Sequence, residues 1–271
     1  MKILFLGDVM GRSGREIVAR CLPGLIEEYG FDFVIVNGEN ASSGRGLNKT
    51  HFHGLVEAGA DVVTLGDHAF DQRDTLSYIE REQILLRPLN FSSGAPGRGV
   101  TLATARNGQQ VLVINALGRV FMKPADDPFH AVEKAISLCP LREAADAIIV
   151  DFHAEATSEM AAMGHFVDGK ASLVVGTHTH IPTSDHRILA GGTGIMSDAG
   201  MCGDYNSVIG MDPDEPLSRF VTGIAGGRFV PADNEATLSG VAIETDDKTG
   251  LCASIWPVRI GGVLEEALPG F

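Results

Sequence analysis

Short apolar runs that stop abruptly at polar residues are the main pattern along this chain. Five runs of four or five residues cover positions 3–7, 33–36, 62–66, 147–150 and 173–176. Runs of this length that end at glycine or polar residues are typical of buried strands. The polar residues that follow them include Asp8, Glu39, Asn40, Asp67, His153, His178 and His180. Because functional groups collect at the carboxyl ends of strands in an open α/β sheet, we expect these side chains to converge.

The remaining hydrophobic pattern predicts helices and additional strands. Helical spacing covers residues 16–23, 50–58 and 131–138, and a glycine-rich turn at 10–15 precedes the first of them. Apolar runs at 99–105 and 111–115 flank Asn107-Gly108, which is a strong hairpin signal. Short strands are also expected at 84–86, 188–189, 194–196, 240–243 and 252–256. The second half is too rich in strands for a simple βαβ repeat, which favours two sheets sharing one core, with helices outside.

Length, composition and charge narrow the class of protein. A chain of 271 residues can form one large α/β domain, and we expect a single domain over residues 1–271. No apolar run approaches the roughly 20 residues of a membrane span, and Asp8 comes too early for a secretory signal, so a cytoplasmic protein without a membrane partner is expected. The four scattered cysteines form no CxxC pair and are expected to be buried free thiols.

The net charge of −14 bears on the partners of the protein. Long nucleic acids bind chiefly through phosphate contacts to Lys and Arg, so stable binding of duplex nucleic acid is not expected. A small phosphorylated substrate remains compatible with this charge, because bound metal ions can reverse the field locally.

The pair His178 and His180 is the strongest single indication of a metal site. If the chain stays extended there, residues two apart point to the same side, so both rings can face one site. The carboxylate of Glu39 and the carboxamide of Asn40 add oxygen donors that suit a hard or borderline cation. Asp67 or Asp71 can instead cap the following helix, and for Asp71 the cap is our prediction. The other histidines are expected at the surface (His51 and His53) or as hydrogen-bonded structural groups (His130, His165 and His186).

The order of these motifs resembles the calcineurin-like metallophosphoesterases. Four stretches, residues 7–11, 37–40, 152–159 and 176–183, resemble the YmdB-like branch of that superfamily more closely. The resemblance implies a four-layer α/β/β/α sandwich that hydrolyses small phosphodiesters, including 2′,3′-cyclic nucleotides, at two metal ions. It also implies the division of the ligands. Asp8, Asn40 and His180 would bind one ion, Asp67, His153 and His178 would bind the other, and Glu39 would bridge the two.

Two positions depart from the superfamily pattern. Met10 stands where the superfamily has a histidine two residues after its first aspartate, and Asn40 is expected to replace that ligand. Asp67 stands where the superfamily has asparagine, so a neutral amide ligand has become a carboxylate. The expected cofactors are two ions of iron, manganese or one of each, with magnesium and zinc left open. The extra charge of Asp67 leads to the hypothesis that its pocket accepts a ferric ion.

The implied mechanism assigns one further residue. Two ions would activate a water molecule for attack on phosphorus, and His68 would act as the general acid at the leaving oxygen. Arg12 and Arg45 are candidate substrate contacts, although an exposed surface position is the stronger expectation for each. A homo-oligomer is expected. Two alternatives stay open, namely a regulatory metal- or nucleotide-binding protein with weak or no hydrolytic activity, and a metal-dependent 5′-nucleotidase.

Overall fold

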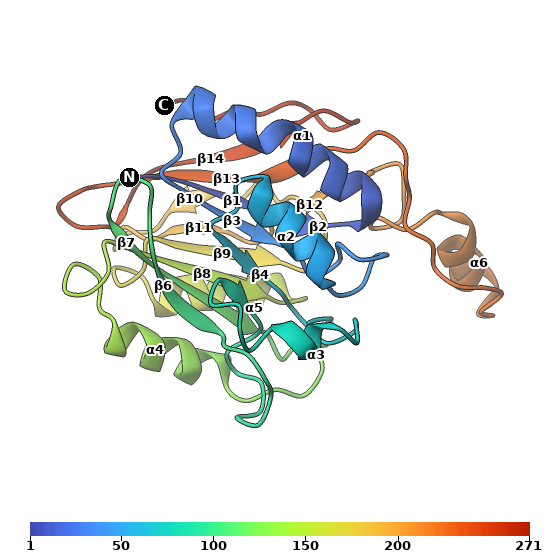
Figure 1. The fold of residues 1–271 in the computed structure, drawn as a ribbon, viewed down its shortest axis with the longest axis horizontal. Coiled ribbons are helices and arrows are strands. Elements are labelled where there is room, and N and C mark those ends of the chain that lie inside the picture. Colours follow the sequence, from blue (N-terminus) through green and yellow to red (C-terminus); the bar gives the residue numbers. More distant parts are fainter.

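Two six-stranded sheets form the centre of the computed structural model, which describes residues 1–271 (Figure 1). The first sheet has the order β14-β13-β1-β3-β4-β5. Its strands are β1 (Lys2–Leu6), β3 (Phe33–Asn37), β4 (Val62–Thr64), β5 (Leu85–Leu86), β13 (Leu238–Thr245) and β14 (Cys252–Ile260). The second sheet has the order β10-β11-β9-β8-β7-β6. Its strands are β6 (Val100–Thr104), β7 (Gln110–Leu117), β8 (Ala147–His153), β9 (Leu173–Thr177), β10 (Arg187–Ile188) and β11 (Gly194–Met196).

Helices cover the outer face of each sheet. The first sheet is covered by α1 (Gly11–Tyr29) and α2 (Lys49–Glu57), and the short α3 (Thr75–Tyr78) follows them. The second sheet is covered by α4 (Pro128–Leu138) and α5 (Thr157–Phe166). A short parallel pair, β2 (Asp8–Val9) and β12 (Met201–Cys202), lies beyond the end of β1. The last helix, α6 (Asp214–Thr222), projects from the body at the right of Figure 1.

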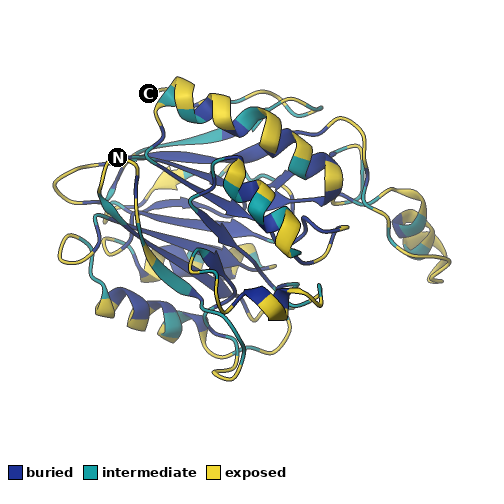
Figure 2. Ribbon diagram, viewed as in Figure 1, coloured by how far each residue is buried: buried dark blue, intermediate teal, exposed yellow.

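Three separate apolar clusters hold these layers together. Leu4 of β1 belongs to the cluster between the first sheet and its helices, whereas Phe5 belongs to the cluster between the two sheets. In the second sheet, Val113 of β7 faces the first sheet and Ile114 faces α4 and α5. Because these strands are buried on both faces, their sequences read as continuous apolar runs, and they appear dark blue in Figure 2. Three interfaces require four layers, so the predicted α/β/β/α sandwich is confirmed.

Parallel pairing brings the polar strand ends to one edge of the sandwich. β3 lies parallel to both β1 and β4 in the first sheet, and β8 lies parallel to both β7 and β9 in the second. Parallel neighbours end on the same side, so the loops after five strands meet there.

The first helix differs from its predicted form. It begins at Gly11, inside the stretch predicted as a turn, and it continues through Pro23 to Tyr29. Proline inside a helix costs about 3 kcal/mol, but Ile17, Leu22 and Leu25 bury one face of α1 against the first sheet on both sides of Pro23. Packing of that face outweighs the local penalty.

Other helices and strands also begin or end at residues that differ from the predicted ones. β8 continues through His153, because it pairs with β7 along its whole length and with β9 from Ile149 to His153, so this histidine is inside the strand rather than after it. α4 begins at Pro128, where Asp127 accepts hydrogen bonds from the next backbone N–H groups. The hairpin at Asn107-Gly108 is confirmed by the antiparallel pairing of β6 with β7. The sequence pattern missed β2, β12, α5 and α6.

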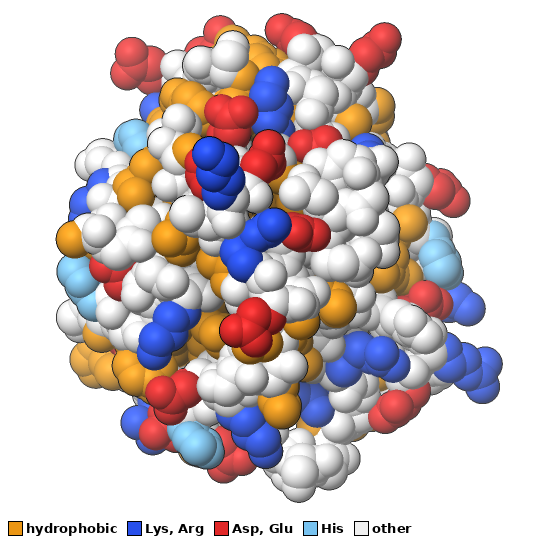
Figure 3. Space-filling model, turned by 90° about the vertical axis from the view of Figure 1, so that its left-hand side faces the viewer, with side chains coloured by type: hydrophobic (Ala, Val, Ile, Leu, Met, Phe, Trp, Pro, Cys, Tyr) orange, Lys and Arg blue, Asp and Glu red, His pale blue; other side chains and the backbone are white.

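Three expectations from composition and charge can be compared with the structure. All four cysteines are free, but only Cys202 and Cys252 are fully buried, and Cys21 and Cys139 are half-buried. None of the helices is both long and apolar enough to span a bilayer. On the face shown in Figure 3, basic side chains are interspersed with acidic ones instead of forming a stripe.

Candidate metal centre

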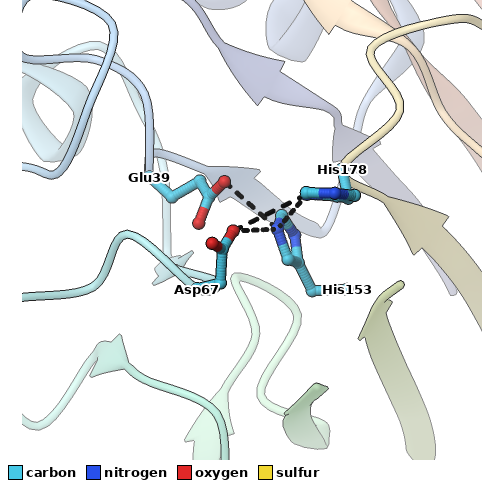
Figure 4. A group of neighbouring side chains, drawn as sticks. All are labelled: Glu39, Asp67, His153 and His178. Carbon is cyan, nitrogen blue, oxygen red and sulfur yellow. Dashed lines mark hydrogen bonds and ion pairs between the residues drawn. The ribbon is translucent and has the colours of Figure 1, made fainter. Parts of the chain in front are cut away.

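Four strand-end side chains form a compact group. The ligand atoms of Glu39, Asp67, His153 and His178 all lie within 4.8 Å of one another (Figure 4). Nε2 of His153 is 3.1 Å from Oε1 of Glu39 and 3.5 Å from Oδ1 of Asp67. Nδ1 of His178 is 3.1 Å from Nε2 of His153 and 3.6 Å from Oδ1 of Asp67. Two carboxylates and two imidazoles give a mixed oxygen and nitrogen donor set that suits a first-row transition metal.

A second group lies beside the first. Nε2 of His180 is 3.3 Å from Oδ1 of Asn40 and 3.9 Å from Oδ1 of Asp8. The two groups are joined at two points. Asn40 follows Glu39 in the chain, and Oδ2 of Asp8 accepts a hydrogen bond from the backbone N–H of His178 at 3.1 Å. All seven residues predicted as metal ligands therefore lie in two adjoining groups.

The backbone at the two histidines is not extended, so that prediction is wrong. β9 ends at Thr177, and the φ angles are +107° at His178 and +66° at His180. Positive φ is uncommon for residues other than glycine and costs on the order of 1–3 kcal/mol where it is held. Both rings reach the site from a tightly turned loop, and the alternation of an extended strand does not explain their shared direction.

The outer nitrogen of His153 has a partner that determines its protonation. Nδ1 of His153 lies 2.8 Å from the hydroxyl of Thr177, and this hydroxyl donates its single hydrogen to Oδ1 of Asp151 at 2.7 Å. Thr177 must therefore accept from Nδ1–H of His153. Asn37 fixes the other oxygen of Asp151 by donating to it at 3.0 Å. In the neutral ring, this tautomer leaves the lone pair on Nε2, on the side of Glu39.

The outer ring nitrogens of the other two histidines also contact acceptors. Nδ1 of His180 donates to the backbone carbonyl of Ile209 at 2.8 Å, and Nε2 of His178 is 3.3 Å from Oε2 of Glu155. A carbonyl or carboxylate can only accept, so in the neutral ring the inner nitrogen of each carries the lone pair, and burial lowers the pKa of both imidazoles. Outer partners of this kind orient the histidine ligands of metal sites.

Two further observations test whether the site fits a cation. Oδ1 of Asp8 and Oδ1 of Asp67 are buried without a hydrogen-bond partner, which is rare for carboxylate oxygens. Burial raises the pKa of Asp8 to about 7. Burial alone would lower the pKa of His153, yet the charge of Glu39 and the neighbouring Asp67 raise it well above its usual value. The field at this imidazole therefore favours positive charge, and the residues present fit metal ions.

His68 lies beside the group without belonging to it. Its Nδ1 is 2.8 Å from Oδ2 of Asp71, and its Nε2 is 4.0 Å from Oδ2 of Asp67. The predicted cap role of Asp71 is wrong, because α3 begins only at Thr75 and the carboxylate of Asp71 instead contacts His68. With Nδ1–H donated to Asp71, Nε2 of His68 is the nitrogen that faces the site.

Several contacts of the site were not predicted. Nζ of Lys123 is 3.0 Å from the backbone carbonyl of Asp67 and 3.3 Å from its Oδ2. The loop that carries Lys123 is held by Glu159, which accepts from the backbone N–H groups of Arg119 and Val120. Lys123 lies in a loop without hydrophobic periodicity, so its position follows only from tertiary structure. The sequence did point to Glu159, because it is the last residue of the stretch 152–159 that resembles the YmdB-like branch.

The remaining histidines and arginines fall outside the two groups. His130 and His165 are exposed, and Nδ1 of His186 has no hydrogen-bond partner, so the prediction that these three are hydrogen-bonded structural groups is wrong. His51 and His53 are partly exposed and line an open pocket, as expected for surface residues, and His51 is bonded to the hydroxyl of Ser42. Arg12 is exposed and pairs with Glu16, which confirms the surface position expected for it.

A pocket of about 440 Å³ opens beside the two groups. One side is polar and carries Arg45 together with Glu39, Asn40, His68, His178 and His180. The other side is apolar and is formed by the segment that carries α6, namely Val208, Ile209, Met211, Pro216, Phe220 and Phe229.

A four-layer sandwich with Asp, Glu, Asn and His side chains at its strand ends defines a protein of the metallophosphoesterase type. Within that class, the family model described as YmdB-like protein matches residues 4–258. The chain therefore belongs to the YmdB-like family.

Similar proteins agree with this membership. The chain is 45% identical over 260 residues to the 2′,3′-cyclic-nucleotide 2′-phosphodiesterase of Bacillus subtilis strain 168, covering 96% of this chain and 97% of that protein. A crystal structure of a hypothetical protein from Thermus thermophilus superposes with a TM-score of 0.89 at 39% identity, covering 97% of this chain and 100% of that one. A crystal structure of a novel phosphatase from Mycoplasma pneumoniae also gives 0.89, at 35% identity over 96% of this chain and 93% of that one.

Proposed function

We propose that this protein is a metal-dependent phosphodiesterase that hydrolyses small phosphodiesters, 2′,3′-cyclic nucleotides among them. The observation that carries the proposal is the shared orientation of the rings of His153, His178 and His180. Each has its outer nitrogen bonded to an acceptor and its inner nitrogen directed at carboxylate or carboxamide oxygens beside a pocket. The name of the relative from Bacillus subtilis supports the substrate class.

The seven residues divide into two ion sites in this proposal. Asp67, His153 and His178 hold one ion, Asp8, Asn40 and His180 hold the other, and Glu39 is shared. The compact group of four supports the first site, and the short distances from His180 to Asn40 and Asp8 support the second. Asn40 occupies the ligand position that Met10 leaves without a donor.

Iron, manganese or one of each are the proposed metals. Asp8, Glu39 and Asp67 bring three negative charges to two ions, and Asp67 brings its charge to one site only. Hard carboxylate oxygens and imidazole nitrogens suit both metals, and the additional carboxylate favours the higher charge of ferric iron in the pocket of Asp67.

The chain's own groups orient the substrate and move a proton. Bound ions would supply an activated water molecule and positive charge for the phosphoryl oxygens. His68 presents Nε2 to the pocket while Asp71 holds its Nδ1, so a proton on Nε2 can pass to the leaving oxygen. The hydrogen bond to Asp71 fixes the direction of the His68 ring. Arg45, at the polar side of the pocket, can contact a substrate phosphate or sugar.

Turnover of defined substrates tests the proposal. Purified protein supplied with Mn²⁺ should hydrolyse 2′,3′-cyclic AMP and bis-p-nitrophenyl phosphate, and His153→Ala should abolish both activities. His165→Ala serves as the matched control, because this histidine is exposed on α5. Release of phosphate from AMP without cleavage of the cyclic substrate would identify a 5′-nucleotidase instead. Retained ions with no turnover of any of these substrates would identify a regulatory binding protein.

Two expectations from the sequence stay predictions. A single functional domain over residues 1–271 predicts one cooperative unfolding transition, which calorimetry measures. A homo-oligomer predicts a mass above that of one chain, which size-exclusion chromatography with light scattering measures.

A further inference from the structure

The segment from residue 205 to residue 232 forms an arm between β12 and β13. In Figure 1 its helix, α6, projects beyond the sandwich. Backbone hydrogen bonds join the two chain segments at its base. Asp212 N–H donates to the carbonyl of Val230 at 2.8 Å, and Ala232 N–H donates to the carbonyl of Gly210 at 2.9 Å. The arm is also tied to the candidate metal centre, because the carbonyl of Ile209 accepts from His180.

The tip of the arm is cross-linked to the chain that returns from it. Arg219 of α6 pairs with Glu215 at 2.6 Å and donates to the carbonyl of Gly227 at 2.8 Å. Glu215 accepts from Gly226 N–H at 3.0 Å. The guanidinium of Arg219 also lies 4.0 Å from the ring centroid of Phe229, which is a cation–π distance. Phe229 therefore has a fixed place relative to α6.

The arm presents two different apolar stripes. Pro216 and Phe220, four residues apart on α6, line the pocket beside the metal centre. Leu217 and Val221, also four residues apart, do not line it. The side chain of Phe220 is 84% exposed and Val221 is 75% exposed. An exposed phenylalanine at the mouth of a polar site adds nothing to the core, so its position there calls for a ligand with an apolar face.

We propose that this wall of the pocket binds the nucleobase of the substrate, with Phe220 as the principal contact and Phe229 behind it. The inference rests on the proposed function and specifies which part of a nucleotide the pocket recognises. A cyclic nucleotide has a charged end and a flat aromatic end, which matches one polar and one apolar wall in a single pocket. A volume of about 440 Å³ is in the range of small-molecule sites.

The composition of the wall also sets the expected specificity. Its six side chains, Val208, Ile209, Met211, Pro216, Phe220 and Phe229, carry no hydrogen-bond donor or acceptor apart from the weakly accepting sulfur of methionine. Stacking on an aromatic ring accepts every base, whereas hydrogen bonds to base edges would discriminate among them. The enzyme should therefore hydrolyse 2′,3′-cyclic nucleotides of all four bases, and the larger purines should have the lower KM.

Removal of the ring, compared on substrates with and without a base, tests the proposal. The two substrates are 2′,3′-cyclic AMP and 1-O-methylribose 2′,3′-cyclic phosphate, which lacks the base. Phe220→Ala should raise the KM for cyclic AMP roughly tenfold, the loss expected from one stacked base, and leave the base-free substrate unchanged. Phe220→Trp should keep the low KM. Val221→Ala, on the neighbouring stripe, should change neither substrate.

Three outcomes would overturn the proposal. If the wild-type protein has the same KM for both substrates, the base makes no contact. If Phe220→Ala, or the control Val221→Ala, impairs both substrates equally, the arm acts only through the structure of the metal centre or through assembly of the protein. If the wild-type protein turns over neither substrate with Mn²⁺, the proposed function itself fails, and the variants are not needed to see it. As a second readout, adenosine should inhibit the wild-type protein competitively and Phe220→Ala much more weakly.

Discussion

The two halves of the candidate metal centre, the compact group around Asp67 and the group around Asn40, use the same kinds of side chain but draw them from different parts of the fold. Asp67, His153 and His178, with Glu39, have all their ligand atoms within 4.8 Å of one another. In the other half, His180 lies 3.3 Å from Asn40 but 3.9 Å from Asp8. Both halves take ligands from the loops after β3 and β9. The compact half adds Asp67, after β4, and His153 of β8, whereas the other half adds Asp8 of β2 and depends on the arm that carries Ile209.

The halves also differ in charge. Asp67 gives the compact half a carboxylate of its own in addition to Glu39, whereas Asn40 in the other half is neutral. Lys123, which lies 3.3 Å from Oδ2 of Asp67, offsets part of this charge, and the sequence-based count of carboxylates omitted it. The comparison teaches that the compact half should retain its ion more firmly, because an additional ligand charge strengthens cation binding.

Glu39→Gln should have the largest effect, since both halves share Glu39 in the proposed arrangement. The neutral amide cannot balance the repulsion of two cations, so we expect both ions to be lost and turnover to fall to background. Metal analysis by mass spectrometry measures this, with the exposed Glu133→Gln on α4 as the control. Loss of one ion alone would show that Glu39 belongs to one half.

His68→Ala should leave both halves occupied and still reduce turnover by roughly 10²–10⁴-fold, the usual loss for a general acid or base. The reason is that His68 contacts Asp71 and the pocket, while its Nε2 is 4.0 Å from Asp67. Metal content and kcat are measured on the same preparation. If the variant lacks one metal equivalent, His68 is a ligand and the assignment is wrong.

Thr177→Val should weaken the compact half selectively. The hydroxyl of Thr177 accepts from His153 and donates to Asp151, and loss of such an outer contact typically costs roughly 10–100-fold in metal affinity or activity. Competition with a chelator measures the release of each ion, and Thr177→Ser, which keeps the hydroxyl, should behave as wild type. Equal weakening of both sites would contradict the selective role.

Asp67→Asn should have the smallest effect on turnover, and its effect should depend on which metal is bound. Removal of one negative charge makes the compact half more positive, so a phosphodiester anion and an activated water molecule are both favoured. We expect a modest rise in turnover with two Mn²⁺ ions and weaker retention of ferric iron. Lower turnover with Mn²⁺, together with unchanged iron retention, would show that Asp67 acts through geometry alone.

The sequence predicted the sandwich and the convergence of the strand-end side chains, for a physical reason. A parallel strand buried on both faces is a continuous apolar run, and the first polar residue after it must lie at the edge of the sheet. Asp8, Glu39 and Asp67 could be placed in this way without knowledge of the loops. The same rule placed His153 at the right edge, although β8 extends through it.

The features that were missed depend on tertiary structure. The positive φ angles of His178 and His180 cannot be read from the residue type, because any residue other than glycine is expected at negative φ. Pro216 is the only buried residue of α6, so this helix is not marked by packing on the core, and its apolar stripes were overlooked. Asp71 was assigned to a helix cap because a local role is the only one that sequence spacing suggests, whereas its partner is His68.

The most direct test of the account is the number of ions per chain measured together with turnover of 2′,3′-cyclic AMP. Protein purified without chelator should contain two ions of iron or manganese per chain. Dialysis against a chelator should first remove the ion of the half that contains Asn40. Turnover should fall with that loss and return when Mn²⁺ is added. Full turnover by protein free of ions, or protein that binds no ion while correctly folded, would contradict the central claim.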